Sequence, residues 1–155
     1  MNSQLTGESV SDEKPVVLFL CTRNLARSQI AEAWLHELAG DRFHATSAGL
    51  VPAEIHPLTN QVMAEVGISL DEHRSKPISE FLGRVAVRHM IVVCANAEKN
   101  CPGIWPFGGQ LEYLPFDDPA SPELAEFEQL VKFREVRDSI ERQIRKWISE
   151  AGIAD

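Results

Sequence analysis

Two short apolar runs constrain the fold more than any other feature of this sequence. Residues 15–20 read Pro-Val-Val-Leu-Phe-Leu, and residues 85–93 end in Met-Ile-Val-Val. Apolar runs of this length, rich in β-branched residues, are typical of strands that are covered on both faces. Such strands occur mainly in parallel sheets flanked by helices, so the sequence predicts an α/β fold.

Segments with helical spacing alternate with the predicted strands. We expect helices over residues 27–39, 58–66, 78–82 and 123–150, and further strands over 43–47 and 111–114. The predicted apolar face of the last helix consists of Phe127, Leu130, Val131, Val136, Ile140, Ile144 and Ile148. Ligands of such sheets bind outside the carboxyl ends of the strands. Cys21, Cys94 and the loop of Asp117 and Asp118 would meet at that edge.

Length, composition and charge fit one domain of ordinary type. The chain has 155 residues, 44% of them apolar, and a net charge of −8. We expect a disordered leader over residues 1–14 and a single catalytic domain over residues 15–155.

No apolar run approaches the ~20 residues of a membrane span, and no basic cluster suits a phosphate backbone, so neither a membrane nor a nucleic acid is predicted as a partner. The first thirty residues lack the pattern of a signal peptide, which predicts a cytoplasmic location.

The cysteines are few and odd in number. Cys21, Cys94 and Cys101 form no C-x-x-C pair, and the five histidines are scattered along the chain. This pattern argues against a disulfide framework and against a structural metal site, and it leaves reactive or merely buried thiols. We predict neither a metal nor a cofactor.

The segment from Cys21 to Ser28 has the composition of an anion cradle. It connects a buried strand to a helix, so its backbone N–H groups and the positive end of the helix dipole can surround an oxyanion. Arg27 adds a fork of donors, and Ser28 can bond to the sulfur. In this setting the pKa of Cys21 would fall below its usual ~8.5, which makes Cys21 a candidate nucleophile. The predicted oxyanion-binding residues are Thr22, Arg23, Asn24, Leu25, Ala26 and Arg27.

At these residues the chain resembles the low-molecular-weight protein tyrosine phosphatases and the thioredoxin-coupled arsenate reductases of the same family. The motifs that carry the resemblance are Cys21-Thr-Arg-Asn-Leu-Ala-Arg-Ser28, Thr46-Ser-Ala-Gly49, Asn100-Cys-Pro102 and Phe116-Asp-Asp-Pro-Ala120. The resemblance implies a flavodoxin-like three-layer sandwich with a four-stranded parallel sheet. The chain departs from the family at Arg23, where Gly is usual, and at Leu25 and Ala26, so the rim of its pocket is bulkier and more cationic.

The resemblance also implies the roles of two carboxylates. Asp118, directly before Pro119, matches the general acid of the family, which protonates the departing oxygen. Asp117 is the alternative acid, and both could instead belong to an ordinary solvated turn.

An arsenate reductase would need all three cysteines. By the resemblance, Cys21 attacks arsenate, Cys94 then attacks Cys21 to release arsenite, and Cys101 moves the disulfide to the surface for thioredoxin or another thiol reductant. Seven residues of intact helix span about 10.5 Å, whereas a disulfide needs Cα atoms ~4.4–6.8 Å apart. The segment between Cys94 and Cys101 must therefore bend or unwind during turnover.

Two alternatives stay open at this point. A low-molecular-weight phosphatase hydrolysing phosphomonoesters would need only Cys21, but the chain has Ala120 and Ser121 where phosphotyrosine enzymes carry aromatic residues. A non-enzymatic anion-binding regulator would use the same cradle with an inert thiol.

Lys76 is the last candidate that the sequence offers. Some relatives bind potassium beside the loop through residues that match Asn24, Glu32 and Ser47 and through a carboxylate, and Lys76 stands at that last position. Its ammonium could neutralise Glu32 in place of the ion, so we predict no potassium requirement. An ordinary surface lysine before a proline is the alternative.

Overall fold

The computed structural model describes residues 14–81, 83–93, 110–121 and 123–154. These residues contain the strands β1 (Val16–Cys21), β2 (His44–Gly49), β3 (Val87–Val92) and β4 (Gln110–Tyr113). The strands form one sheet in the order β2-β1-β3-β4, and each pairing is parallel. The predicted α/β fold with a four-stranded parallel sheet is confirmed. Apart from Lys14, the leader predicted over residues 1–14 lies outside the described residues.

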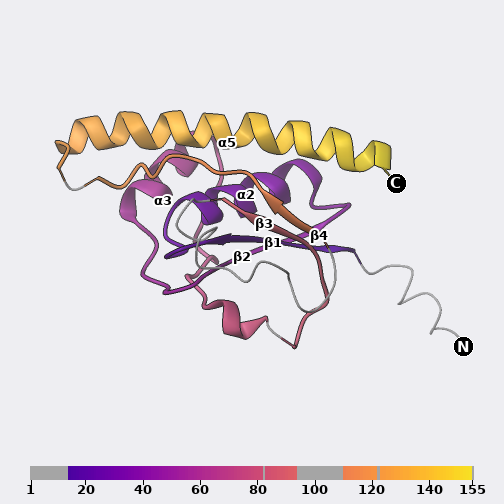
Figure 1. The fold of residues 1–155 in the computed structure, drawn as a ribbon. Coiled ribbons are helices and arrows are strands. Elements are labelled where there is room, and N and C mark those ends of the chain that lie inside the picture. The colour runs from indigo at the N-terminus through magenta and orange to yellow at the C-terminus, as the bar shows by residue number, and fades with distance from the viewer. Residues whose placement is uncertain (1–13, 82, 94–109, 122, 155) are drawn as a thin grey trace, which may run out of the picture.

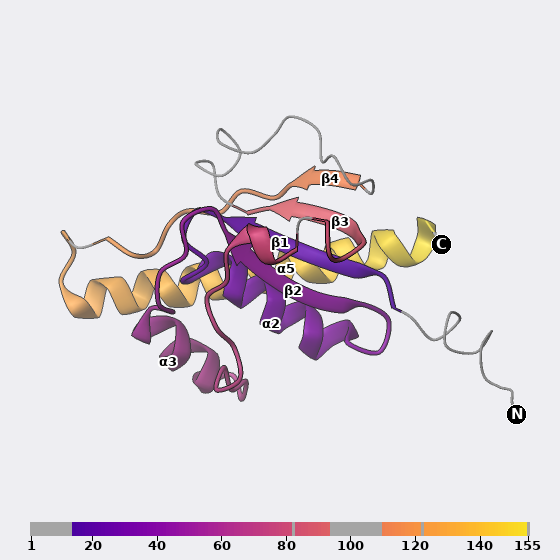
Figure 2. The same cartoon turned by 90° about the horizontal axis from the view of Figure 1, so that it is seen from below.

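The three α-helices of the described residues share one face of the sheet. The helices α2 (Arg27–Ala39), α3 (Pro57–Glu65) and α5 (Glu126–Ala154) lie on one face, and the 3-10 turn η1 (Ile78–Glu80) lies on the other (Figure 1). The view from below shows β1, β2 and η1 in front of α2 and α5 (Figure 2). Within the described part of the chain, no helix combines the length and hydrophobicity that a membrane crossing needs. In place of the helix predicted over residues 78–82, the structure has the single 3-10 turn η1. The backbone N–H of Phe81 donates to the carbonyl of Ile78 in this turn.

The apolar face predicted for α5 is confirmed in part. The buried face of this helix contains Phe133, Val136, Ile140, Ile144 and Trp147, which recur at helical spacing. The predicted member Phe127 is 71% exposed, because it lies six residues before Phe133, where this face begins.

The first turn of α5 begins three residues later than predicted. A turn joins Leu124 to Ser121, and the carboxylate of Glu128 accepts the N–H of Ala125 at 3.1 Å. This half of a capping box fixes Ala125 before the first helical residue. At its other end the helix continues past the predicted residue 150 to Ala154.

The order of the strands brings three loops together at one edge of the sheet. Cys21 ends the central strand β1 and lies beside Gly49, the end of β2. On the other side, the N–H of Val93 bonds to the carbonyl of Leu20 at 2.9 Å. The N–H of Phe116 in turn bonds to the carbonyl of Val93, so the loop that carries Asp118 starts next to the end of β1.

Candidate active site

The sulfur of Cys21 lies at the bottom of the loop between β1 and α2 and is surrounded by hydrogen-bond donors. Cys21 is 2% exposed. Its Sγ lies 2.9 Å from Oγ of Ser28 and accepts the backbone N–H of Asn24 at 3.1 Å. Ala26, at the N-cap of α2, has no side chain that can cap the helix, so the first N–H groups of α2 stay available to an anion. This geometry stabilises negative charge at the sulfur.

The side-chain amide of Asn24 is oriented by its bonds and leaves the hydroxyl proton of Ser28 available for Cys21. The Oδ1 atom of Asn24 accepts the backbone N–H of Lys76 at 2.9 Å, and a backbone N–H can only donate. The Nδ2 atom therefore faces Ser28 and donates to its oxygen at 2.7 Å. Since the hydroxyl oxygen accepts this bond, its own proton can point at the sulfur. The contact at 2.9 Å places Ser28 where it can donate to a Cys21 thiolate.

Asn24 holds an unusual backbone conformation to make these contacts. Its φ is +58°, in the left-handed region that side chains other than glycine seldom occupy. The amide of Gln29 donates to both Oδ1 and the carbonyl of Asn24, at 3.0 and 3.3 Å. Gln29 is fully buried, although it was not among the predicted site residues. A signal was available, because it is a polar side chain directly before Ile30 on a helix whose buried residues are mostly apolar.

Arg27 connects the cradle to the loop that carries the predicted acid. Its guanidinium donates to the carbonyl of Phe116 at 3.2 Å and lies 3.6 Å from Asp118. The carboxylate of Asp118 also accepts the N–H of Ala120 at 3.0 Å. Asp118 lines the pocket above Cys21, whereas its alternative, Asp117, is not among the lining residues. The geometry therefore favours Asp118 as the carboxyl group that reaches a bound oxyanion.

The pocket above the sulfur is small and is lined by two arginines, Arg23 and Arg27. Its volume is about 290 Å³. The lining residues are Cys21, Thr22, Arg23, Leu25, Ala26, Arg27, Asp118 and Ala120. Asn24, which the sequence placed among the oxyanion-binding residues, is completely buried and supports the loop from behind. None of the described lining side chains is aromatic, so this part of the pocket offers no stacking surface to an aryl ring.

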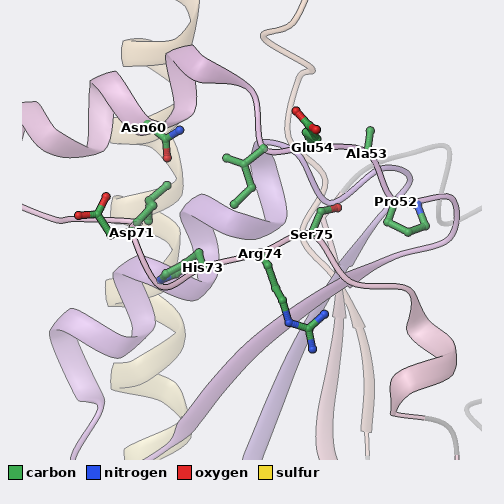
Figure 3. Close-up of a pocket in the computed structure, with 10 residues that line it drawn as sticks. Pro52, Ala53, Glu54, Asn60, Asp71, His73, Arg74 and Ser75 are labelled. Carbon is green, nitrogen blue, oxygen red and sulfur yellow. The ribbon is translucent and has the colours of Figure 1, made fainter.

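A wider pocket lies beside the cradle, between residues 52–60 and 70–75 (Figure 3). It has a volume of about 910 Å³ and shares no lining residue with the pocket above Cys21. Glu54 and Asp71 line it, and the guanidinium of Arg74 pairs with Glu80 at 2.6 Å. The two carboxylates disfavour an oxyanion in this wider pocket.

Lys76 lies under the cradle beside Glu32. It is 9% exposed, and its ammonium donates to the carbonyl of Arg74 at 2.9 Å and lies 3.8 Å from Glu32. The hydroxyl of Ser47 donates to the same carboxylate. Burial lowers the pKa of Lys76 and the charge of Glu32 opposes that shift. Because the side chain is buried, Lys76 is not an ordinary surface lysine. In the described ranges, no group of three or more acidic, His or Cys side chains could hold a metal ion.

The two other cysteines, Cys94 and Cys101, lie outside the described residues. Val93 is the last placed residue before them, and its N–H bonds to the strand that ends in Cys21.

This fold and this site define a class of protein, an α/β domain that holds a cysteine sulfur at the base of a strand–loop–helix turn, beside a buried Ser and below a pocket lined by arginines. The chain belongs to the low molecular weight phosphotyrosine protein phosphatase family, whose model matches residues 16–153. It is 36% identical over 139 residues to an arsenate reductase of Halalkalibacterium halodurans, covering 90% of this chain and 98% of that protein.

Solved structures give the same relationship. An arsenate reductase in the phosphate binding state superposes with a TM-score of 0.73 at 29% identity, over 88% of this chain and 98% of that one. A thioredoxin-dependent arsenate reductase of Corynebacterium glutamicum superposes with a TM-score of 0.70 at 30% identity, over 96% of this chain and 67% of that one.

Proposed function

We propose that this protein is an arsenate reductase. The observation that carries the proposal is the sulfur of Cys21, which lies 2.9 Å from Oγ of Ser28 and accepts the N–H of Asn24, below a pocket lined by two arginines. Arsenate is a small dianion that matches the size and charge of this pocket. Relatives along nearly the whole chain are arsenate reductases, which supports this substrate over a phosphate ester.

The first step forms a bond between sulfur and arsenic. The Cys21 thiolate attacks the arsenic atom of arsenate while Arg27 and the loop N–H groups hold the remaining oxygens. Asp118 gives a proton to the departing hydroxyl group, which leaves as water. The product is an arsenic(V) adduct on Cys21.

The second step reduces arsenic. A thiolate of Cys94 attacks the sulfur of Cys21, and the electron pair of the sulfur–arsenic bond leaves with arsenic as arsenite. A Cys21–Cys94 disulfide remains. Cys101 then attacks Cys94, which frees Cys21 as a thiolate and leaves a Cys94–Cys101 disulfide for an external dithiol to reduce.

The chain path supports this relay. Val93 lies beside Leu20, so the segment with Cys94 starts next to the strand that ends in the nucleophile. Thioredoxin is the reductant that we propose, because a relative of similar structure is a thioredoxin-dependent arsenate reductase. The cytoplasmic location stays a prediction of the sequence.

The test compares two reactions in one set of variants. Wild type, Cys21→Ser, Cys94→Ser and Cys101→Ser are assayed for arsenate reduction with thioredoxin and, in parallel, for aryl phosphate hydrolysis. We expect Cys21→Ser to abolish both reactions, since both need the nucleophile. Cys94→Ser and Cys101→Ser should lose arsenate reduction and keep any phosphate ester cleavage.

Two outcomes would contradict the proposal. Retention of thioredoxin-linked arsenate reduction by both resolving-cysteine variants would exclude the relay. Efficient aryl phosphate hydrolysis by a wild type that does not reduce arsenate would favour the phosphatase alternative.

A further inference from the structure

His56 caps helix α3 with a nitrogen that can accept only while the ring is neutral. Its backbone is extended, with φ −63° and ψ 135°, and Pro57 follows as the first helical residue. The Nδ1 atom accepts the backbone N–H of Leu58 at 3.1 Å. A neutral imidazole can do this with its proton on Nε2, whereas an imidazolium has N–H groups at both nitrogens and no acceptor. Protonation of His56 is therefore incompatible with this cap.

The same residue is attached to the anion cradle. The backbone N–H of His56 donates to the carbonyl of Leu25 at 3.0 Å, and the hydroxyl of Thr59 donates to that carbonyl at 2.9 Å. Leu25 lines the pocket above Cys21. The first turn of α3 and the wall of the pocket thus share one carbonyl group, so a disturbance of the cap reaches the cradle through two hydrogen bonds.

The surroundings of the imidazole favour its neutral form. The ring packs on Phe133 of α5, with centroids 4.8 Å apart, and its Nδ1 atom meets the uncharged backbone N–H of Leu58. Burial lowers the pKa of His56 from 6.5, and the nearby carboxylate of Asp118 opposes that shift without cancelling it. Among the described residues, Asp118 is the one whose charge acts on the ring.

We propose that His56 is a pH-sensitive positioning residue. Its neutral imidazole holds the first turn of α3 against the cradle, and its protonation breaks the cap and loosens the cradle wall at Leu25. The inference goes beyond the proposed arsenate reduction, because it concerns the shape of the cradle for any oxyanion. It can therefore succeed or fail independently of the substrate.

The sign of the effect follows from proton linkage. The folded protein holds the pKa of His56 below 6.5, whereas in the unfolded chain it stays near 6.5. The unfolded chain therefore binds more protons, and the free energy of unfolding falls as the pH drops from about 6.5 through the lower, folded-state value. Each unit between the two pKa values corresponds to a tenfold change in the folding equilibrium constant.

The test replaces the titrating cap by one that does not titrate. In His56→Asn the amide oxygen can accept the same bond, and Asn is a preferred N-cap residue. His56→Ser offers a second cap in case the amide does not fit, and His44→Asn removes an exposed histidine on β2 as the control. Urea unfolding is measured for all four proteins between pH 8 and pH 5.

A second measurement reports on the cradle itself. Sulfate is the probe, because it stays a dianion between pH 5 and pH 8, and its dissociation constant is measured for wild type and His56→Asn across that range. Titration of Cys21 occurs in both proteins and cancels in the ratio of the two constants. We expect the wild type to lose sulfate affinity relative to His56→Asn as the pH falls through the folded-state pKa of His56, which lies below 6.5, by up to about tenfold for each pH unit below that pKa.

The results separate the proposal from a purely structural role. We expect wild type and His44→Asn to lose stability below pH 6.5 relative to His56→Asn and His56→Ser. If all four unfolding curves change in parallel with pH, His56 does not titrate against folding and the proposal is wrong. A sulfate ratio that stays constant while the stability curves diverge would also overturn it, because the cap would then act on α3 alone.

Discussion

Replacement of Gly49 by alanine tests how the cradle holds its sulfur. A Cβ atom at this position would lie 2.8 Å from the carbonyl carbon of Arg23 and 2.9 Å from the backbone nitrogen of Asn24. Carbon atoms normally approach to about 3.5–4.0 Å, so the loop must move back by about half an ångström or more. Overpacking of this kind costs about 1–3 kcal/mol of unfolding free energy.

The displacement acts directly on the thiolate. The nitrogen that the new methyl group would push is the one that donates to Sγ of Cys21 at 3.1 Å. A hydrogen bond to a charged group is worth about 1.5–3 kcal/mol, and 1.4 kcal/mol corresponds to one pKa unit. We therefore expect Gly49→Ala to raise the pKa of Cys21 by about one unit.

The assay is the pH dependence of alkylation by iodoacetamide, in a background with Cys94→Ser and Cys101→Ser so that only Cys21 reacts. Gly67→Ala is the matched control, because Gly67 has φ +81° and no neighbour within 4 Å of an added Cβ. Strain in that left-handed conformation should cost about 1–2 kcal/mol of stability and leave the thiol unchanged. A Gly49→Ala protein whose Cys21 titrates like wild type would refute the reasoning.

Three further predictions concern the same site. Ser28→Ala removes a donor from the sulfur, so the alkylation profile should show the pKa of Cys21 raised by about one unit; an unchanged profile would mean that Ser28 does not donate to it. Asp118→Asn should lower arsenate turnover by about 10²-fold or more and leave the alkylation rate of Cys21 nearly unchanged, whereas full turnover would remove Asp118 from the mechanism. Replacing potassium by a bulky inert cation should leave wild-type activity unchanged, since Lys76 already pairs with Glu32; a large loss would contradict this.

The local chemistry of the cradle could be predicted from the sequence because the residues that make it are adjacent. Cys21, Arg27 and Ser28 lie within one strand, one loop and the first turn of one helix, so their mutual positions follow from local geometry. The bond between Ser28 and Cys21 was predicted for this reason and is present in the structure. The buried strands were also predictable, because an uninterrupted apolar run is typical of a strand that is covered on both faces.

Other features depend on chain segments that are far apart in sequence. Gln29 and Lys76 fix the amide of Asn24, and the two anchors lie 47 positions from each other. The exposure of Phe127 was mispredicted because helical spacing defines an apolar stripe but does not say where a neighbouring element stops covering it.

The sequence by itself determined the class of chemistry, since a thiol, a guanidinium and a hydroxyl at fixed short spacing have the same geometry in any strand–loop–helix unit. Only the tertiary structure decided which of two adjacent carboxylates faces the pocket and which way the Asn24 amide points. It also decided that a histidine on α3 is bonded to the cradle wall. The physical reason is that hydrogen bonds between distant segments depend on how helices pack on the sheet, and side-chain packing in three dimensions sets that geometry.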